Sequence, residues 1–232
     1  KPLMMSDTHI PLPERLRPRD LSEIIGQDHL LGEHAPLRQM IDQGHLPSII
    51  FWGPPGVGKT TIALLLAQAV DRPFISLSAL NTGVKELREV IAESGDLLTP
   101  VVFIDEIHRF NKSQQDALLG AVEKGKITLI GATTENPSFE VNSALLSRCQ
   151  VYTLNSLDAD AIQSLINRAI QADSFLRQRH IQIEEYDALV QFAAGDARKA
   201  LNLIDLIAST FEPDIENIVT NAVVVRVAQQ NI

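Results

Sequence analysis

The feature that most constrains this chain is a glycine-rich loop placed between an apolar strand and an apolar helix. Residues 53–60 have the sequence GPPGVGKT, which fits the phosphate-binding pattern G-x-x-x-x-G-K-[ST] in full. Residues 49–52 before the loop are apolar, and residues 60–70 after it follow a helical pattern. Glycines at these positions let consecutive backbone N–H groups curl around phosphate oxygens at the start of the helix. The pattern therefore predicts a phosphate site on an α/β fold.

Each position of the loop has an expected role. Lys59 supplies positive charge to the outer phosphates, and the hydroxyl of Thr60 is placed to bind Mg²⁺. The other predicted contacts to the nucleotide in this segment are Gly53, Pro54, Pro55, Gly56, Val57, Gly58 and Thr61.

A pair of acidic residues supplies the second part of the expected site. Asp105 and Glu106 directly follow the apolar run 101–104, which is expected to end beside the phosphate loop. Asp105 would hold the metal and its waters. Glu106 would orient and polarise an attacking water molecule. The loop and the acids together indicate hydrolysis and not nucleotide binding alone.

Apolar runs alternate with helical patterns as far as about residue 154, after which the pattern is helical only. The predicted strands are 48–52, 74–77, 101–104, 127–130 and 150–154, and the predicted helices between them are 60–70, 85–92 and 113–123. Alternation at these lengths predicts a parallel sheet with helices on both faces. We expect two domains, a nucleotide-binding core at 1–154 and a helical lid at 155–232, in which Asp196 caps a helix.

Composition restricts the partners and the compartment. The chain carries 20 basic and 29 acidic residues, a net charge of -9, which argues against coating nucleic acid by bulk charge but leaves a local basic patch possible. The central apolar run 62–67 is far shorter than the roughly 20 residues of a membrane span, so no membrane partner is expected. The single cysteine, Cys149, cannot form an internal disulfide. We therefore expect a cytoplasmic protein.

Several motifs resemble those of the AAA+ ATPases of the clamp-loader clade. They are 105–108 (DEIH), 131–134 (GATT), 147–149 (SRC) and 195–198 (GDAR). Within that clade, segments 107–116 and 131–139 resemble the family of replication-associated recombination protein A and the Werner helicase-interacting protein. The resemblance runs from about residue 17 to the end of the chain. It implies a P-loop AAA+ core with a parallel five-stranded sheet, a small all-α lid, and ATP and Mg²⁺ as cofactors.

The resemblance also assigns roles to individual residues. Thr134 matches the sensor 1 position, a polar group at a strand end that reaches the γ-phosphate and the attacking water. Arg198 matches sensor 2 on the lid helix, and Arg148 matches the arginine finger that acts on the ATP of the adjacent subunit. Ser78 resembles the switch position that can hold Glu106 away from the water.

Two further regions have expected ligands. Ile25 resembles the residue of the N-terminal segment that packs on the adenine ring. The helix start at 83–88 resembles the part of clamp loaders that meets the DNA backbone, so Lys85 and Arg88 are candidate phosphate contacts, with Lys112 as a third. A solvated helix face is an equal alternative for these basic residues. No aromatic residues are interleaved with them, which favours sequence-independent contact over base reading.

The expected function is that of a DNA-dependent ATPase acting on DNA ends or junctions at stalled replication forks of a bacterial nucleoid. The resemblance implies single-strand-binding protein as a partner and self-association into a ring or tetramer. The alternative within this class is a clamp-loader or branch-migration motor subunit. A protein-remodelling ATPase is disfavoured because residues 79–83 lack the aromatic residue of a pore loop. A non-catalytic scaffold is disfavoured because the phosphate loop, the acids and the finger are all present.

Two departures from the family pattern qualify these expectations. Clamp loaders carry an adjacent basic pair in the helix after the acidic strand, whereas this chain has Leu119 and Gly120 there. The contact that this pair makes to a neighbouring subunit is therefore not expected. The sequence also ends at residue 232, where family members continue into a helical oligomerisation region.

Overall fold

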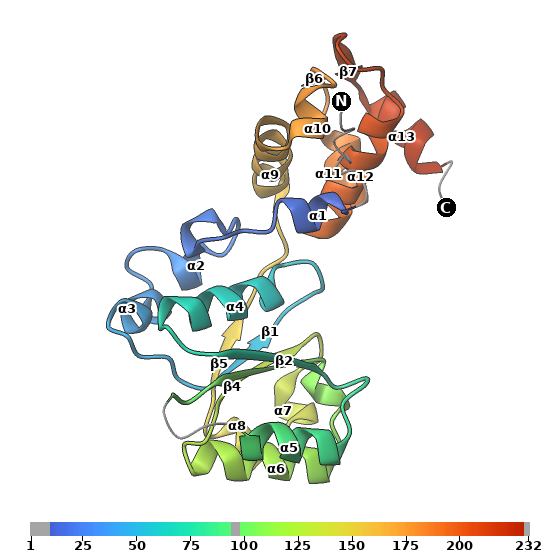
Figure 1. Ribbon diagram of the computed structural model, residues 1–232. Coiled ribbons are helices and arrows are strands. Elements are labelled where there is room, and N and C mark those ends of the chain that lie inside the picture. The colour runs from blue at the N-terminus through green and yellow to red at the C-terminus, as the bar shows by residue number, and fades with distance from the viewer. Residues whose placement is uncertain (1–9, 94–97, 230–232) are drawn as a thin grey trace, which may run out of the picture. The chain divides into compact units, whose positions relative to one another are not determined.

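The computed structural model describes residues 10–93 and 98–229 and divides the chain into two compact units (Figure 1). One unit is Arg19–Asn155, and the other combines Lys1–Pro18 with Ser156–Ile232. The expected domains at 1–154 and 155–232 differ from these units chiefly in the residues before Arg19, which group with the C-terminal unit. Residues 1–9 and 94–97 of the expected core and residues 230–232 of the expected lid lie outside the described residues.

A five-stranded sheet forms the centre of the first unit. Its strands are β1 (Ile49–Trp52), β2 (Phe74–Ser78), β3 (Val101–Asp105), β4 (Thr128–Thr133) and β5 (Gln150–Thr153). The order is β2-β3-β4-β1-β5, and every pair is parallel. Central strands of such a sheet are covered on both faces, which explains why β3 and β4 are apolar and buried over almost their whole length. The predicted parallel five-stranded sheet is confirmed.

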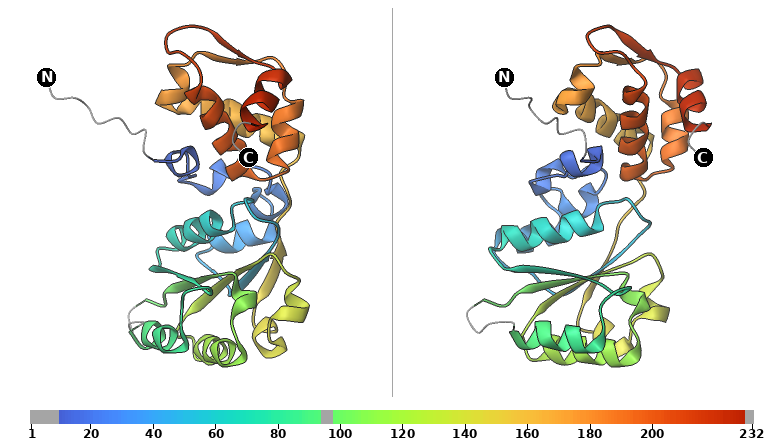
Figure 2. Two further views of the ribbon diagram at one scale, coloured as in Figure 1. Left: turned by 90° about the vertical axis from the view of Figure 1, so that its right-hand side faces the viewer. Right: turned by 45° about the vertical axis from the view of Figure 1, so that its right-hand side comes forward.

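Helices cover both faces of this sheet (Figures 1 and 2). On one face lie η2 (Leu21–Glu23), α2 (Asp28–Leu31), α3 (Pro36–Asp42) and α4 (Lys59–Ala69). On the other face lie α5 (Val84–Glu93), η3 (Ile107–Arg109), α6 (Lys112–Glu123), α7 (Pro137–Glu140) and α8 (Ser143–Leu146). Alternate side chains of β1 serve the two cores, since Phe51 packs with α4 and Ile50 packs with α6. Successive side chains of the strand thus point to opposite faces of the sheet.

The second unit is mostly helical. Its elements are α1 (Leu12–Arg15), α9 (Ala159–Ala172), α10 (Ser174–Arg177), β6 (Ile181–Ile183), α11 (Asp187–Ala193), α12 (Ala197–Ser209), β7 (Asn217–Val219) and α13 (Asn221–Gln229). Asp196 caps α12 as predicted, accepting from the N–H groups of Arg198 and Lys199 at 2.8 and 3.1 Å. Within the described ranges, no helix is both long enough and apolar enough to span a bilayer.

The expectation of an all-α lid is wrong in one detail, because β6 and β7 pair as a parallel two-stranded sheet. Each strand has three residues, too few for a period-2 pattern to stand out beside the helical patterns around them.

Arg15 attaches α1 to the rest of the second unit. Its Nε donates to Asp173 Oδ2 at 2.8 Å, and its Nη2 donates to Asp173 Oδ1 at 3.2 Å and to Asp205 Oδ1 at 3.1 Å. The side chains of Arg15 and Asp173 are only 12% and 6% exposed. The hydrogen bond with Asp173 raises the pKa of Arg15 above its ordinary value. The bidentate pair stabilises the unit strongly relative to a state in which the Asp173 carboxylate is buried without the guanidinium.

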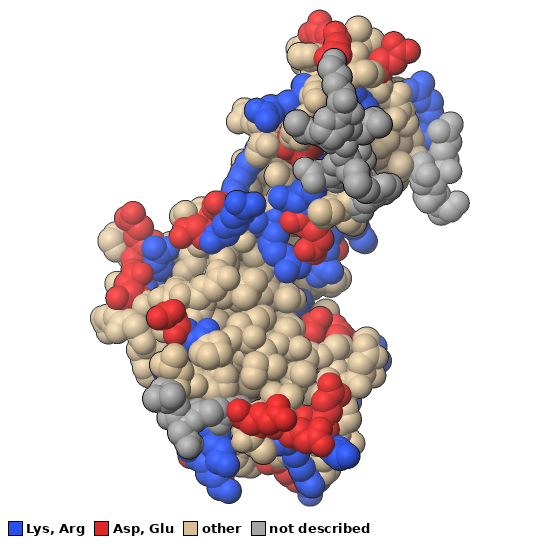
Figure 3. All heavy atoms as spheres, viewed as in Figure 1, with Lys and Arg blue, Asp and Glu red and all other residues tan. Residues whose placement is uncertain are grey.

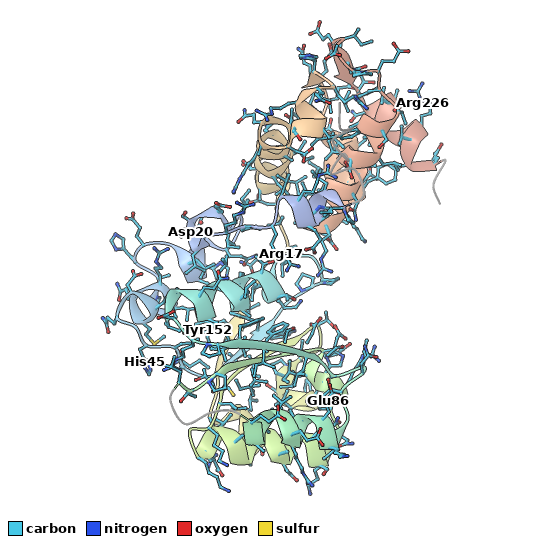
Figure 4. All side chains as sticks on the ribbon, viewed as in Figure 1. Arg17, Asp20, His45, Glu86, Tyr152 and Arg226 are labelled. Carbon is cyan, nitrogen blue, oxygen red and sulfur yellow. The ribbon has the colours of Figure 1, made fainter. Side chains whose placement is uncertain are left out.

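We therefore expect Arg15→Ala to lower the free energy of unfolding by about 3 kcal/mol or more, because it leaves Asp173 buried and unpaired. Arg17→Ala is the matched control: Arg17 pairs with Glu14 at 2.9 Å on the exposed surface (Figure 4), where an ion pair contributes about 0–1 kcal/mol. Urea denaturation followed by circular dichroism measures both. Equal, small losses in the two variants would show that the Arg15 cluster does not stabilise the unit.

Candidate nucleotide-binding site

The glycine-rich loop joins β1 to α4 with a backbone that only glycine adopts readily. Gly56 and Gly58 have φ values of 74° and 97°, in the left-handed region. Gly58 is the N-cap residue of α4, and no side chain in the described part of the chain caps this helix. The first helical bond runs from Ile62 N–H to Gly58 O at 2.8 Å. The N–H groups of the first turn therefore point toward the loop, an arrangement that suits phosphate oxygens.

Close packing holds the start of the loop against the sheet. A Cβ atom on Gly53 would lie 2.6 Å from the backbone oxygen of Leu154, so the position requires glycine. The N–H group of Gly53 donates to Thr133 O at 3.1 Å, which ties the loop to the end of β4. Lys59 Nζ donates to Gly53 O and to Pro54 O, both at 2.7 Å. The lysine ammonium is thereby held directly over the loop.

The other predicted loop residues divide by exposure. Pro54 and Pro55 are exposed, whereas Val57 is buried in the core that α4 shares with the sheet. Thr60 and Thr61 are half-buried in the first turn of α4. Val57 is thus the apolar side chain that adds an anchor in the core to the backbone contacts of Gly53.

The acidic pair lies at the same edge of the sheet as the loop. All strands are parallel, so their carboxyl ends meet at one edge, and β4 lies between β1 and β3. Asp105 is the last residue of β3, pairs in register with Ser78, and accepts from its neighbour Glu106 N–H at 3.1 Å. Lys59, Thr60 and the two acids therefore belong to one unit and one edge, as their motifs predict.

The donor set at this edge fits a magnesium ion held together with phosphates. Thr60 offers a hydroxyl and Asp105 a carboxylate, both hard oxygen ligands. No group of three or more His, Cys, Asp or Glu side chains in the ranges that the structure describes is placed to hold a metal by itself. Two protein ligands are the share expected when phosphate oxygens and waters complete the coordination of Mg²⁺.

Glu106 has an unusual backbone and two basic neighbours. Its φ and ψ are 56° and 41°, a left-handed conformation that few residues other than glycine adopt. Its Oε2 lies 3.3 Å from His108 Nε2 and 3.3 Å from Arg109 Nε. Ser78, the predicted switch residue, accepts instead from Leu80 N–H at 3.3 Å and makes no hydrogen bond to Glu106 among the described residues.

The residues with roles implied by the resemblance occupy different elements. Thr134 follows β4 and is half-buried, whereas Thr133, the last residue of β4, is fully buried. Arg148 lies between α8 and β5, where its Nη2 pairs with Glu123 Oε1 of α6 at 2.6 Å. Arg198 is the second residue of α12 and is exposed, in the other unit. The roles of Thr134, Arg148 and Arg198 remain predictions.

The segment around Ile25 is attached to the end of β5. Ile25 is half-buried and precedes Gly26, whose φ is 82°. The side chain of Gln27 is buried, donates to Asn155 O at 2.8 Å and accepts from Asn155 N–H at 3.1 Å. A ring nitrogen of His29 lies 2.9 Å from Thr153 O. The anchoring role of Gln27 was not predicted, because the burial of its amide appears only in the folded structure.

The candidate DNA contacts are exposed but are mixed with acids. Lys85 is 92% exposed and lies 3.7 Å from Glu89 on the same helix, α5. Arg88 is also exposed on α5, a helix that carries the exposed acid Glu86, labelled in Figure 4. Red and blue side chains lie together over this part of the surface in Figure 3. Lys112 begins α6 and is exposed. The assignment of DNA phosphates to these residues stays a prediction.

Comparison with known proteins identifies the domain. Residues 49–157 match the ATPase family associated with various cellular activities (AAA). The chain contains an AAA ATPase domain. It is 49% identical over 211 residues to replication-associated recombination protein A of Coxiella burnetii, covering 89% of this chain and 48% of that protein. It is 45% identical over 202 residues to ATPase WRNIP1 of Dictyostelium discoideum, covering 84% of this chain and 23% of that protein.

The predicted resemblance is confirmed, and the relatives carry names from the predicted class of function. The chain spans about half the length, or less, of these curated relatives. Among solved structures, the RuvB Holliday junction branch migration motor of Thermotoga maritima has a TM-score of 0.76 and 25% identity, over 92% of this chain and 72% of that chain. A variant of the same RuvB has a TM-score of 0.78. The AAA fold thus agrees with the strand order and the loop described above.

Lys59→Ala is expected to abolish stabilisation of the AAA domain by MgATP, because it removes the ammonium group held over the loop. For the wild type, nucleotide at 100 times its Kd should add about 2.7 kcal/mol of stability. Differential scanning fluorimetry with and without MgATP measures the shift in Tm. Lys126→Ala is the control, since Lys126 is exposed in the turn before β4. A normal shift for Lys59→Ala would mean that nucleotide binds elsewhere.

Proposed function

We propose that this chain hydrolyses ATP to ADP and phosphate at the edge formed by the loop after β1 and the acids after β3. The observation that carries this proposal is the shared edge: Lys59 faces the loop, and Glu106 follows the strand next to β4. A water oxygen attacks the γ-phosphorus, the bond to the β,γ-bridging oxygen breaks, and the water proton is taken up at the Glu106 carboxylate. Bound Mg²⁺, held by Thr60 and Asp105, supplies charge stabilisation to the phosphates.

The same proposal places this hydrolysis in DNA replication and recombination. Its support is the similarity to proteins named replication-associated recombination protein A and WRNIP1. We propose a cytoplasmic DNA-dependent ATPase that self-associates, works with single-strand-binding protein and acts on DNA ends or junctions at stalled forks. Lys85, Arg88 and Lys112 would contact DNA phosphates without reading bases.

A second candidate is a branch-migration motor subunit. The observation that favours it is the likeness to RuvB over 92% of this chain. A protein-remodelling role lacks such support, because the loop that follows β2 exposes Leu80 and contains no aromatic residue. ATP turnover with forked DNA, Holliday junctions and an unfolded protein as alternative stimulants distinguishes the three.

Glu106→Gln is expected to retain ATP binding while turnover falls about 10²-fold to 10⁴-fold, the range for loss of a general base. The amide fills the space of the carboxylate but cannot accept the water proton. Turnover of the full-length protein with and without forked DNA, together with ATP affinity, tests both parts of the proposal. Normal turnover in Glu106→Gln would remove Glu106 from the reaction. Turnover that no DNA stimulates would remove the DNA dependence.

Arg148 can turn to a neighbouring subunit with only a small loss of free energy from its present contacts. Its ion pair with Glu123 is on the surface, with both side chains 43% exposed, and such pairs contribute about 0–1 kcal/mol. Its Nη1 also donates to Ala144 O at 3.0 Å. Nη1 donates to Ser147 Oγ at 3.0 Å as well. All these contacts lie on the exposed surface, so a γ-phosphate on a second copy can compete for the guanidinium. We propose that Arg148 completes the site of the adjacent subunit.

Mixing full-length Arg148→Ala with full-length Glu106→Gln should therefore restore part of the ATP turnover. In mixed assemblies some sites combine an intact Glu106 with an intact Arg148 from the other variant, and a finger is worth roughly 10³ to 10⁵ in rate. The control mixes full-length Arg148→Ala with the full-length double variant Arg148→Ala/Glu106→Gln. This mixture contains no intact Arg148, so its turnover should not recover. A mixture as inactive as its parents, despite demonstrated co-assembly, would exclude action across the interface.

A further inference from the structure

His108 links the carboxylate of Glu106 to the end of β4. Its Nε2 lies 3.3 Å from Glu106 Oε2, and its Nδ1 lies 2.9 Å from Thr133 Oγ1. The His108 side chain is 11% exposed, and Thr133 is fully buried. One imidazole therefore contacts an element at each side, the turn after β3 and the last residue of β4.

The hydroxyl of Thr133 is itself held in place. It accepts from Glu135 N–H at 3.0 Å and lies 3.2 Å from Glu135 O. The far end of the link is thus fixed by backbone groups that follow β4. Thr134, the predicted sensor of the γ-phosphate, is the residue between Thr133 and Glu135. A movement of this strand end would therefore reach His108 directly.

The hydrogen-bonding capacity of the ring fixes the direction of the link. In a neutral ring only one tautomer satisfies both contacts: Nε2–H donates to Glu106, and Nδ1 accepts from the Thr133 hydroxyl. In a doubly protonated ring Nδ1–H donates to Thr133, whose own proton turns to Glu135 O. In either state Nε2 carries a proton on the side of the Glu106 carboxylate.

Arg109 contacts the same carboxylate oxygen but has no second anchor in the part of the chain that the structure describes. Its Nε donates to Glu106 Oε2 at 3.3 Å, and its side chain is 55% exposed. An exposed pair of this kind imposes little geometry. The comparison singles out His108, because its side chain is only 11% exposed, contacts Thr133 through a hydrogen bond and lies 3.3 Å from the Glu106 carboxylate.

We infer that His108 is a positioning residue that sets the Glu106 carboxylate from the end of β4. The inference rests on the proposed hydrolysis and adds a residue to it. It requires that both contacts of the imidazole contribute to ATP turnover, the Nε2 contact with Glu106 and the Nδ1 contact with Thr133. Neither end alone would orient the carboxylate relative to the strand that borders the phosphate loop.

Two amide variants of the full-length protein separate the ends. In His108→Asn the amide replaces Nδ1, so it reaches Thr133 but not Glu106; in His108→Gln the amide replaces Nε2, so it reaches Glu106 but not Thr133. We expect kcat for ATP to fall on the order of 10²-fold in each, the cost of misplacing a reacting group by about 1 Å, with the Kd for ATP kept within about threefold. Thr133→Val should also lower kcat in the wild type and add little to His108→Gln.

His45→Asn is the matched control, because His45 is an exposed histidine in the loop before β1 (Figure 4). Wild-type kcat in both His108 variants would overturn the inference. A fall in kcat accompanied by a comparable fall in ATP affinity and a lower Tm would also overturn it, because that pattern marks a structural role. If the wild type and Glu106→Gln turn over ATP alike, Glu106 has no part in the proposed hydrolysis and the inference about His108 fails with that role.

A measurement on the wild type does not depend on variants that fold. Nitrogen-15 spectra of histidine-labelled protein at a pH where the ring is neutral should place the His108 proton on Nε2. A neutral ring with its proton on Nδ1 would overturn the assigned direction of the link.

Discussion

The close packing of β4 between β1 and β3 is the constraint on which the site depends. Ile130 of β4 pairs in register with Ile49 on one side and with Phe103 on the other. At the next residue, Gly131, a Cβ atom would lie 2.7 Å from Ile50 Cδ1 and 2.8 Å from Ile107 Cδ1. The absence of a side chain there lets η3 approach β4. The phosphate loop and the acidic turn can then share one short stretch of the sheet edge.

The parts of the site that sequence predicts are those encoded by neighbouring residues. The loop at 53–60 is recognisable because its glycines are required by the local backbone conformation. Gly56 and Gly58, for example, have left-handed φ values. The acids after 101–104 are recognisable because a buried central strand is an unbroken apolar run. Strand number and parallel direction follow from the same local patterns, since helices alternate with these runs.

The parts that sequence does not predict depend on pairs of distant residues. Gln27 bonds to Asn155, and Arg15 bonds to Asp173 across 158 positions, contacts that exist only once the chain has folded. The same holds for the contact between His108, which follows β3, and Thr133, the last residue of β4. The motif at 131–134 marks two adjacent threonines as special. Which of them faces the acidic turn is decided by the register of β4 and not by the motif.

The backbone of Glu106 and its side chain are controlled by different parts of the structure. A left-handed conformation at a residue other than glycine costs about 1–3 kcal/mol and persists only where its surroundings determine it. Here Ile104 and Ile107 on either side are fully buried, so the core fixes the backbone between them. The core does not fix the carboxylate, which is 28% exposed. The orientation of that carboxylate therefore depends on its neighbours in the turn. The less exposed of these, His108, is hydrogen-bonded to the last residue of β4, the strand that ends beside the phosphate loop.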